Sequence, residues 1–517
     1  MKLCTSQQMR ALDGAAVKDY GIPSILLMEN AGRATVEAVV HRFGDPAGRR
    51  VLVFAGPGNN GGDGLVIARH LHQRGARPEI ILLVEPDRFR GDAAVNLAIA
   101  QKLGLPIAVK QHIDELFVPA RDLHDVWLMV DSLFGTGLTR EINGHFAEAV
   151  TIMNRASCPV VAVDTPSGLD SDSGRVLGAC VAADLTVTYG LAKIGQVIEA
   201  GPALCGELVV ADISIPPRAV AEADLVYELL DHGIGRLLPR RPTGAHKGTS
   251  GHLLVIAGST GKTGAAMLAG LGAMRVGAGL VTMAVPAALD HVFETSLMEA
   301  MTLPLSSSDK GILSIKDYDR IVECLIGKRA LVIGPGLGTA EETAELVLTL
   351  YRNVPLPMVV DADALNILAQ HPEVLRHPGG EAGPRILTPH PGEMARMIDW
   401  TTREVQAERL IVAGSFATIN NTVTVLKGAG TVVCHPDGRA AVNPSGNPGM
   451  ASGGMGDVLS GVIGGLLAQG LAAWEAARLG VYLHGLAADR LAAQCPLGYL
   501  AGEVADELPN AMAALLK

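Results

Sequence analysis

Short apolar runs recur along the first half of the chain, and each ends in a polar residue or glycine. They are V-L-V-F-A (51–55), I-I-L-L-V (80–84), W-L-M-V-D (127–131), V-V-A-V-D (160–164) and L-T-V-T-Y (185–189). Amphipathic stretches such as 64–74 and 92–103 lie between several of them. This alternation of strand and helix patterns predicts an α/β fold with a parallel, doubly wound sheet that binds ligands at the carboxyl ends of its strands.

The same alternation restarts at Gly251. The runs H-L-L-V-I-A-G, L-V-T-M-A-V-P, A-L-V-I-G-P-G and M-V-V-D-A-D each resemble a strand that continues into a loop. Apolar runs separated by glycine turns near 423–442 predict antiparallel hairpins added to this second sheet. A proline-containing stretch at 215–224 separates the halves. We therefore predict two domains, residues 1–220 and 221–517.

The composition supports two globular α/β domains and disfavours some classes of binding partner. A chain of 517 residues exceeds one ordinary core, and its 48% hydrophobic, 3% aromatic content with 61 glycines suits small-residue helices on parallel sheets. Few aromatics and a net charge of −11 without a basic block disfavour nucleic acid and anionic membranes as partners. Seven dispersed cysteines and a start without an apolar signal region predict a cytoplasmic protein with reduced thiols.

Three strand-end segments of the first half carry candidate chemistry. The segment V-L-V-F-A-G-P-G-N-N-G-G-D-G is a strand, a glycine turn and a helix start, where backbone N–H groups suit a phosphate. It lacks the dinucleotide G-x-G-x-x-G pattern, and a plain turn capped by Asp63 is the alternative. The segments 131–141 and 164–170 end two further strands, so all three are expected to meet in one crevice.

In the second half, G-S-T-G-K-T-G-A (258–265) does not make a P-loop. The Walker pattern requires a glycine where this chain has Ile256, so Lys262 is not assigned to phosphate. The loop 333–338 offers bare backbone, and D-A-D in 360–366 offers paired carboxylates for Mg²⁺ or for polar capping. His390 and Glu393 lie in a proline-bounded loop, and Lys427 begins a glycine turn that suits a nucleotide or is a simple hairpin.

The segment from Gly446 to Asp457, G-N-P-G-M-A-S-G-G-M-G-D, is the most informative feature of the second half. Glycine-rich backbone beside a helix start favours an anion, and Asp457 is placed to accept a proton from a hydroxyl that is being phosphorylated. The alternative is a glycine-rich turn with aspartate as a helix N-cap. The apolar run that follows is interrupted by glycine and predicts a buried helix.

The first half resembles the NAD(P)H-hydrate epimerase domain through L-L-M-E-N-A-G, G-N-N-G-G-D-G, D-S-L-F-G-T-G-L and D-T-P-S-G-L-D. The resemblance implies a Rossmann-like fold that binds hydrated nicotinamide cofactor and K⁺. It implies Asn60, Asp131 and Ser167 as K⁺ ligands, and we expect Asp164 to act as general acid/base at the hydroxyl-bearing carbon. The implied substrate-binding residues are Asn59, Asn60, Gly61, Gly62, Asp63, Gly135, Thr136, Gly137, Leu138, Thr139, Arg140, Glu141 and Asp164.

From about Gly244 the chain resembles the ADP-dependent NAD(P)H-hydrate dehydratases, which have a ribokinase-like fold. The shared motifs are H-K-G, G-K-T-G-A-A, G-P-G-L-G, D-A-D-A-L-N, T-P-H-P-G-E, K-G-A-G-T and the segment ending at Asp457. The resemblance implies ADP and Mg²⁺ as cofactors and Asp457 as catalytic base. The implied substrate-binding residues are Ala265, Gly336, His390 and Asp457, and the implied nucleotide-binding residues are Lys427, Gly428, Ala429, Gly430, Thr431 and Gly456.

Together the two resemblances predict a bifunctional metabolite-repair enzyme. One domain would epimerise the R and S hydrates of NADH and NADPH, and the other would dehydrate the S hydrate, giving NAD(P)H, AMP and phosphate. The family resemblance implies a homo-oligomer, with a tetramer expected, and the motifs are compatible with ADP and ATP alike. Two alternatives stay open: a vitamin or sugar kinase in the second half, and a nucleotide-binding sensor or scaffold in the first.

Overall fold

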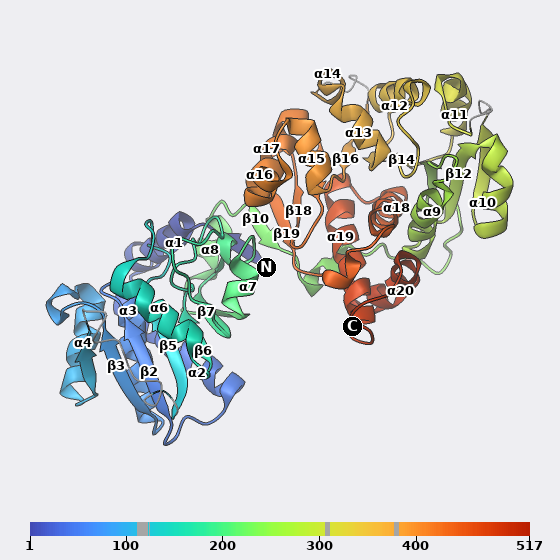
Figure 1. The fold of residues 1–517 in the computed structure, drawn as a ribbon. Helices are drawn as coiled ribbons and strands as arrows, with labels where there is room; N and C mark the ends of the chain where they lie inside the picture. The colour runs from blue at the N-terminus through green and yellow to red at the C-terminus, as the bar shows by residue number, and fades with distance from the viewer. Residues whose placement is uncertain (111–122, 124, 306–310, 377–381, 517) are drawn as a thin grey trace. The chain divides into compact units, whose positions relative to one another are not determined.

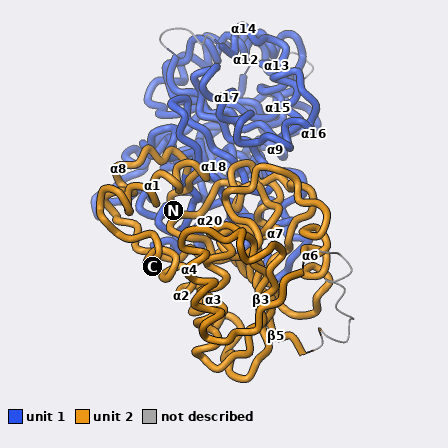
Figure 2. Tube along the Cα trace, turned by 90° about the vertical axis from the view of Figure 1, so that its left-hand side faces the viewer, with its two compact units in different colours: residues 1, 228–517 blue, residues 2–227 orange. Residues whose placement is uncertain are grey.

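The computed structural model describes residues 1–110, 123, 125–305, 311–376 and 382–516. The chain divides into two compact units, coloured separately in Figure 2. One unit comprises Lys2–Tyr227, and the other comprises Glu228–Lys517 together with Met1. The change between units thus falls a few residues after position 220, the domain boundary that the proline-containing stretch at 215–224 predicts.

The first unit alternates strands and helices along the chain (Figure 1). Its strands are β1 (Lys2–Cys4), β2 (Arg50–Ala55), β3 (Arg77–Leu82), β4 (Ile107–Val109), β5 (Val126–Ser132), β6 (Val160–Val163), β7 (Leu185–Tyr189), β8 (Ala192–Lys193) and β9 (Glu207–Ala211). Its helices are α1 (Ser6–Lys18), α2 (Ser24–Phe43), α3 (Asn59–Gln73), α4 (Gly91–Lys102), α6 (Gly144–Arg155), α7 (Gly201–Cys205) and α8 (Pro217–Glu222), with short 3₁₀ turns at Pro86–Arg88 and Ile194–Gln196.

The sheet of this unit has the order β4–β3–β2–β5–β6–β7–β9, and every neighbouring pair is parallel. Side chains of β2 alternate between its two faces, as strand geometry requires. Val51 and Val53 belong to the core that holds α2, α3 and α4, whereas Leu52 and Phe54 belong to the core that holds α6. The predicted doubly wound sheet is therefore confirmed.

The second unit has a longer list of elements. Its strands are β11 (His252–Ile256), β12 (Leu280–Pro286), β13 (Met301–Leu305), β14 (Ala330–Ile333), β15 (Met358–Val360), β16 (Arg385–Leu387), β17 (Val423–Leu426), β18 (Thr431–Cys434) and β19 (Ala440–Asn443), and β10 (Tyr227–Leu229) begins at the unit boundary. Its helices are α9 (Thr263–Arg275), α10 (Asp290–Ser296), α11 (Tyr318–Cys324), α12 (Glu341–Asn353), α13 (Asp363–Ala369), α14 (Pro372–Arg376), α15 (Pro391–Ile398), α16 (Thr402–Ala407), α17 (Arg409–Asn420), α18 (Met455–Ala468), α19 (Ala473–Ala492) and α20 (Ala501–Ala514).

The strands of the second unit follow the order β13–β12–β11–β14–β15–β16–β17–β18–β19. The pairs from β13 to β17 are parallel, and β17, β18 and β19 pair antiparallel, as the sequence predicts for 423–442. Helix α18 packs against α9 and α19, and these helices share one apolar core with Leu253 and Val255 of β11 (Figure 1). The predicted α/β fold of the second half, with its antiparallel addition, is confirmed.

The structure corrects one local prediction. Helix α3 begins at Asn59, so the motif N-N-G-G-D occupies the first turns of a helix instead of a loop in front of it. The buried helix predicted after Asp457 is confirmed as α18. Across the residues that the structure describes, we find no helix with the length and apolar character needed to span a membrane.

Candidate active sites in the two units

A cavity of about 680 Å³ lies at the carboxyl ends of the first unit's strands. The three loops that the sequence predicts to converge do contribute to it. Of the predicted substrate-binding residues, Asn59, Asn60, Asp63, Gly135, Thr136, Gly137, Leu138 and Asp164 line the cavity. Helix α1 forms a further part of the wall, which no sequence motif indicated.

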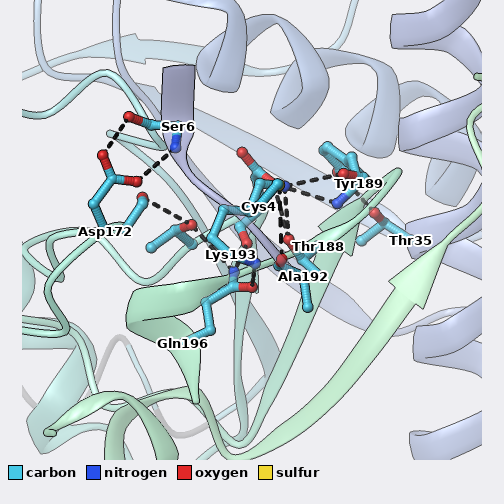
Figure 3. A network of polar contacts seen from close by, with 12 residues as sticks. Cys4, Ser6, Thr35, Asp172, Thr188, Tyr189, Ala192, Lys193 and Gln196 are labelled. Atoms are coloured by element: carbon cyan, nitrogen blue, oxygen red, sulfur yellow. Dashed lines mark hydrogen bonds and ion pairs between the residues drawn. The ribbon is translucent and has the colours of Figure 1, made fainter. Parts of the chain in front are cut away.

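Asp164 carries a buried ion pair at this cavity. Its Oδ1 accepts hydrogen bonds from Lys193 Nζ at 2.6 Å and from Thr188 Oγ1 at 3.1 Å. The Lys193 side chain is only 1% exposed and the Asp164 side chain 15% exposed. Charges held this deeply need a partner, and this ion pair supplies one to each side chain. Figure 3 shows Lys193 and Thr188 at the centre of this network.

The backbone around Asp164 is also held in place. Asp164 has φ 64°, a left-handed conformation that side chains other than glycine, asparagine and aspartate rarely adopt. Gln196 Nε2 donates to the Asp164 carbonyl oxygen at 2.6 Å, and the Asp164 amide donates to the Val187 carbonyl oxygen at 2.8 Å. These bonds fix the turn that aims the carboxylate into the cavity.

Asp63 and the glycines beside it play different parts. Burial and the nearby Asp164 and Asp13 raise the pKa of Asp63, which lines the cavity, well above its ordinary value. Gly61 does not line the cavity; a Cβ there would lie 1.8 Å from the Gly56 carbonyl oxygen. Gly62 packs against Met28 and Ala93. These two glycines therefore allow α3 to approach its neighbours closely.

Two of the three predicted K⁺ ligands, Asp131 and Ser167, are in direct contact, and Asn60 lies near the loop that bonds to Ser167. Ser167 donates from its amide to Asp131 Oδ2 at 2.7 Å and from Oγ to Asp131 Oδ1 at 2.6 Å. Burial raises the pKa of Asp131 to about 6, although these bonds lower it. Asn60 lies against Gly135. The amide of the preceding residue, Phe134, donates to Ser167 Oγ at 2.9 Å. The buried Asn60 Nδ2 has no hydrogen-bond partner among the described residues.

Three further predicted residues of this unit lie outside the cavity wall. Thr139, Arg140 and Glu141 are exposed in the loop before α6 and are not among its lining residues. The resemblance placed them at the substrate because they continue the G-T-G-L motif. In the structure Leu138 is the last residue of this loop that lines the cavity, and Ile142 pairs with Gly178 in an isolated bridge.

In the second unit, Asp457 lies in the first turn of α18 behind a left-handed Gly454 with φ 89°. The first N–H groups of a helix have no partner within it and attract an anion. Burial first, and then the carboxylate of Asp361, raise the pKa of Asp457 to about 6. Such a carboxylate is ionised at neutral pH and basic enough to take a proton.

Lys427 joins the segments around Asp457. Its Nζ donates to Asp361 Oδ1 at 2.7 Å and lies 3.9 Å from Glu393 Oε2. Burial alone would lower the pKa of Lys427, but Asp361 and Glu393 raise it overall. The second oxygen of Asp361 accepts a hydrogen bond from Ser460 Oγ on α18. These contacts connect β15, β17, α15 and α18 at one point.

The predicted nucleotide-binding turn has a support that the sequence analysis missed. Arg409, at the start of α17, donates from Nη1 to the Lys427 carbonyl oxygen at 3.3 Å and from Nη2 to the carbonyl oxygens of Leu426 at 3.1 Å and Gly430 at 3.4 Å. Gly428 has φ 142°, and its missing Cβ would lie 2.7 Å from Arg409 Nη1. The turn is therefore a fixed shape rather than a loose hairpin.

Gly456, the last predicted nucleotide-binding residue, is also crowded. A Cβ at Gly456 would lie 3.2 Å from Lys427 Nζ. Glycine at this position thus lets the first turn of α18 approach the lysine, which brings two predicted nucleotide-binding segments together.

The predicted substrate-binding residues of this unit come together in part. Gly336 has φ 62°, and a Cβ there would lie 3.1 Å from Ala265 Cβ, so these two residues meet. His390 caps α15: its Nδ1 accepts from the Gly392 amide at 3.0 Å, and its amide donates to Glu393 Oε2 at 2.7 Å. Burial and the nearby Lys427 lower the pKa of His390, which keeps the ring neutral.

The D-A-D carboxylates face different partners. Asp361 binds Lys427 as described, whereas Asp363 Oδ2 accepts from Lys262 Nζ at 3.0 Å and from the Gly338 amide at 2.8 Å. Each carboxylate is thus neutralised by its own lysine. Lys262 faces a carboxylate, which agrees with the rejection of a P-loop. Within the described part of the chain, no cluster of three or more His, Cys, Asp or Glu side chains is suited to a metal ion.

The sequence analysis also missed Lys193 and Ser460. Both are single polar residues inside apolar stretches, G-L-A-K-I-G and V-L-S-G-V-I, where a strand or a buried helix is the natural interpretation. A lysine in a buried strand is the only sequence signal that could have indicated Lys193, because lysine is almost never fully buried without a partner.

Fold and sites together define a class: a two-unit α/β enzyme with a separate carboxylate–lysine centre in each unit. A family model described as NAD(P)H-hydrate dehydratase matches residues 253–510, and one described as YjeF-related protein N-terminus matches residues 24–195. The chain is 46% identical to the "Bifunctional NAD(P)H-hydrate repair enzyme Nnr" of Moorella thermoacetica, covering 98% of this chain and 96% of that protein. The protein of the same name from Thermofilum pendens is 38% identical, with coverage of 100% and 97%.

The chain belongs to the family of bifunctional NAD(P)H-hydrate repair enzymes. A solved structure of the ADP/ATP-dependent NAD(P)H-hydrate dehydratase from Bacillus subtilis, co-crystallised with ATP and Mg²⁺, is 33% identical. It covers 56% of this chain and 98% of its own, with a TM-score of 0.49. The family membership predicted from the motifs of both halves is thereby confirmed.

Proposed function

We propose that the first unit interconverts the R and S hydrates of NADH and NADPH and that the second unit dehydrates the S hydrate at the expense of ADP. The observation that carries this proposal is that each unit has its own aspartate–lysine ion pair at its strand ends, with Asp457 near the pair of the second unit. Two separate centres suit two successive reactions on one metabolite.

In the first unit, Asp164 acts as general acid/base at the hydroxyl-bearing carbon of the reduced ring. Lys193 holds the Asp164 carboxylate by an ion pair at the wall of the cavity, where the hydrate ring binds. The predicted residues Asn59, Asn60, Asp63 and the 135–138 loop line the space for the rest of the cofactor. The first N–H groups of α3 offer a site for its phosphates.

The predicted K⁺ ligands fit such an ion by their chemistry. Asn60, Asp131 and Ser167 supply amide, carboxylate and hydroxyl oxygens, which are the hard donors an alkali cation prefers. The amide of Asn60 is buried without a structural hydrogen bond through Nδ2, so its side chain is not committed to holding the fold. A bound K⁺ would supply a fixed positive charge beside the phosphates of the cofactor.

In the second unit, phosphate from ADP is transferred to the hydroxyl of the S hydrate, and phosphate then leaves with restoration of the dihydronicotinamide. Hydroxide is a poor leaving group, and phosphorylation converts it into a good one. Asp457 removes the hydroxyl proton, while the amides of 453–456 stabilise the transferring phosphoryl group. Ala265, Gly336 and His390 border the hydrate, and Lys427–Thr431 with Gly456 hold the nucleotide.

The two carboxylates of the D-A-D motif, Asp361 and Asp363, do not fit the role of protein ligands to Mg²⁺. Asp361 and Asp363 are each neutralised by a lysine, so a divalent ion would have to arrive with the phosphates of the nucleotide. A homo-oligomer such as a tetramer stays a prediction, and analytical ultracentrifugation of the full chain would test it. The cytoplasmic location also stays a prediction.

The deciding experiment incubates the full chain with mixed R/S hydrate, ADP and Mg²⁺. Repair restores the dihydronicotinamide absorbance with release of one phosphate per molecule, and the whole R/S mixture is consumed. A kinase would instead accumulate phosphorylated substrate. A first unit that only binds nucleotide would leave the R hydrate to its slow spontaneous inversion, which chiral analysis of the remaining hydrate would reveal.

A further inference from the structure

Helix α1 contributes one face to the cavity of the first unit. Met9, Arg10, Asp13, Gly14, Val17 and Lys18 line the cavity, a spacing that keeps them on one side of a helix. This helix precedes residues 24–195, to which the YjeF-related family model corresponds. Of these six residues, Asp13 is the carboxylic acid.

Asp13 is held in the cavity without a hydrogen-bond partner for one oxygen. Its Oδ1 is buried and bonds to no described group. A buried carboxyl oxygen left unsatisfied costs free energy, so such a group in a binding cavity points to a partner that the ligand supplies. The buried Asn60 Nδ2 is a second unsatisfied polar atom on the same cavity wall.

Lys193 has no hydrogen left to donate to Asp13. Its ammonium group has three hydrogens, and they are used by Asp164 Oδ1 at 2.6 Å, Thr188 Oγ1 at 2.9 Å and the Tyr189 carbonyl oxygen at 3.0 Å (Figure 3). The other ionisable groups that act on Asp13 are the carboxyls of Asp164 and Asp63 and the thiol of Cys4. Three carboxyls therefore share one ammonium group, which is already paired with Asp164.

This arrangement separates the roles of two carboxyls. Asp164, paired with Lys193, is suited to be the base, and Asp13, which forms no ion pair with a described lysine or arginine, is suited to be the acid. Burial first, with Asp164 adding to it and Lys193 opposing it, raises the pKa of Asp13 to about 6. Two carboxyls in one cavity, one paired with a lysine and the other with an unpartnered oxygen, suit the separate roles of base and acid on one substrate.

We infer that Asp13 is a second catalytic residue of hydrate epimerisation, the acid that protonates the departing hydroxyl. This inference rests on the proposed function of the first unit. Water adds to an enamine with its oxygen on the carbon bonded to nitrogen, so the ring nitrogen lone pair can expel the hydroxyl. The C–O bond breaks, Asp13 gives its proton to make water, and a C=N⁺ bond forms.

Inversion is completed by return of water to the opposite face of the ring. A new C–O bond forms, the C=N⁺ electrons go back to nitrogen, and Asp164 takes the proton from the incoming water. One water leaves and one returns, a proton moves from Asp13 to Asp164, and nothing is oxidised or reduced. The return of that proton through solvent resets the site.

The test uses the full chain with Asp13→Asn, Asp13→Glu and, as a matched control, Asp19→Asn. Asp19 follows α1 and is not among the cavity-lining residues. We expect Asp13→Asn to lower kcat of R/S interconversion by about 100- to 1,000-fold with KM within about threefold, as for loss of a general acid. Asp13→Glu should recover part of that loss, and Asp19→Asn should interconvert like wild type.

A pH profile and an isotope-exchange measurement test the role of Asp13 independently of the rate that the variant retains. Because an acid must be protonated to act, kcat should fall as the pH rises through about 6, and Asp13→Asn should lack this limb. In H₂¹⁸O, each inverted hydrate should carry ¹⁸O. Retention of the original oxygen, or a falling limb that persists in Asp13→Asn, would overturn the inference even if the variant were unstable.

Dehydration of pure S hydrate with ADP is the internal control for an intact second unit, and a circular-dichroism melt checks the first. Interconversion by Asp13→Asn within threefold of wild type, with Asp19→Asn active, would end the role of Asp13 and leave the epimerase assignment intact. Absence of interconversion in both wild type and Asp19→Asn would instead remove the proposed function of the first unit.

Discussion

Replacement of Asp457 by asparagine removes the proposed base of the second unit while keeping the size of the side chain. Loss of a positioned general base lowers kcat by about 100- to 10,000-fold. Because the Asp457 side chain lies in the first turn of α18 and forms no hydrogen bond with a described residue, the helix should survive the change. Nucleotide affinity should be unchanged or tighter, since a negative charge near the phosphates is lost.

The raised pKa adds a magnitude to this prediction. With a pKa of about 6, Asp457 is about nine-tenths ionised at pH 7 and about one-tenth ionised at pH 5. Dehydration should therefore fall about ninefold between pH 7 and pH 5 in wild type. Since the folded-state pKa lies above the ordinary value of 3.8, protonation of this carboxyl favours the folded protein, and its titration cannot cause acid unfolding here.

The assay is single-turnover dehydration of pure S hydrate, followed by the return of dihydronicotinamide absorbance between pH 5 and pH 8. Calorimetric ADP binding is measured beside it. Asp319→Asn, an equivalent change of charge at the start of α11, is the matched control. A flat rate across this pH range, or turnover by Asp457→Asn within tenfold of wild type, would refute the reasoning.

Three further predictions follow from contacts of the two sites. Lys193→Met should leave Asp164 buried without its cation, which destabilises the first unit by about 3–5 kcal/mol. Interconversion should be lost while dehydration persists. A thermal melt of the variant, together with the interconversion and dehydration assays, checks this. Gly61→Ala should place a Cβ against the Gly56 carbonyl oxygen and lower the melting temperature of the first unit, whereas Gly14→Ala, which meets nothing within 4 Å, should raise it slightly. Arg409→Lys should loosen the Lys427–Thr431 turn, because more than one hydrogen bond to the turn is lost. We expect KM for ADP to rise about tenfold with little change in kcat, and initial rates at varied ADP concentration measure both.

The elements of both units could be predicted from the sequence because their patterns are local. The strand at 51–55, the hairpins near 423–442 and the buried helix after Asp457 each follow from a short run of residues and its punctuation. The glycine-rich and proline-bounded loops also indicated the right strand ends, because such loops have few structural reasons to exist elsewhere.

The rest of the sites depends on contacts between distant segments. Lys193 reaches Asp164 across 29 positions of sequence, and Arg409 reaches the Lys427 turn across 18. Helix α1 has no glycine-rich motif, and only the path of the chain brings its Asp13 to the cavity. Conversely, Gly61 and Gly62 were interpreted as phosphate-binding glycines because the motif alone cannot distinguish a backbone open to a ligand from one pressed against its neighbour.

The left-handed backbone of Asp164 has a consequence for mutational tolerance. Valine or isoleucine at this position would combine loss of the carboxylate with a backbone conformation that β-branched residues avoid, so the loop itself would deform. Alanine shares part of that penalty. Inactive variants of this kind report on the shape of the turn as much as on proton transfer, and asparagine, which accepts the same backbone angles, is the substitution that isolates the chemistry.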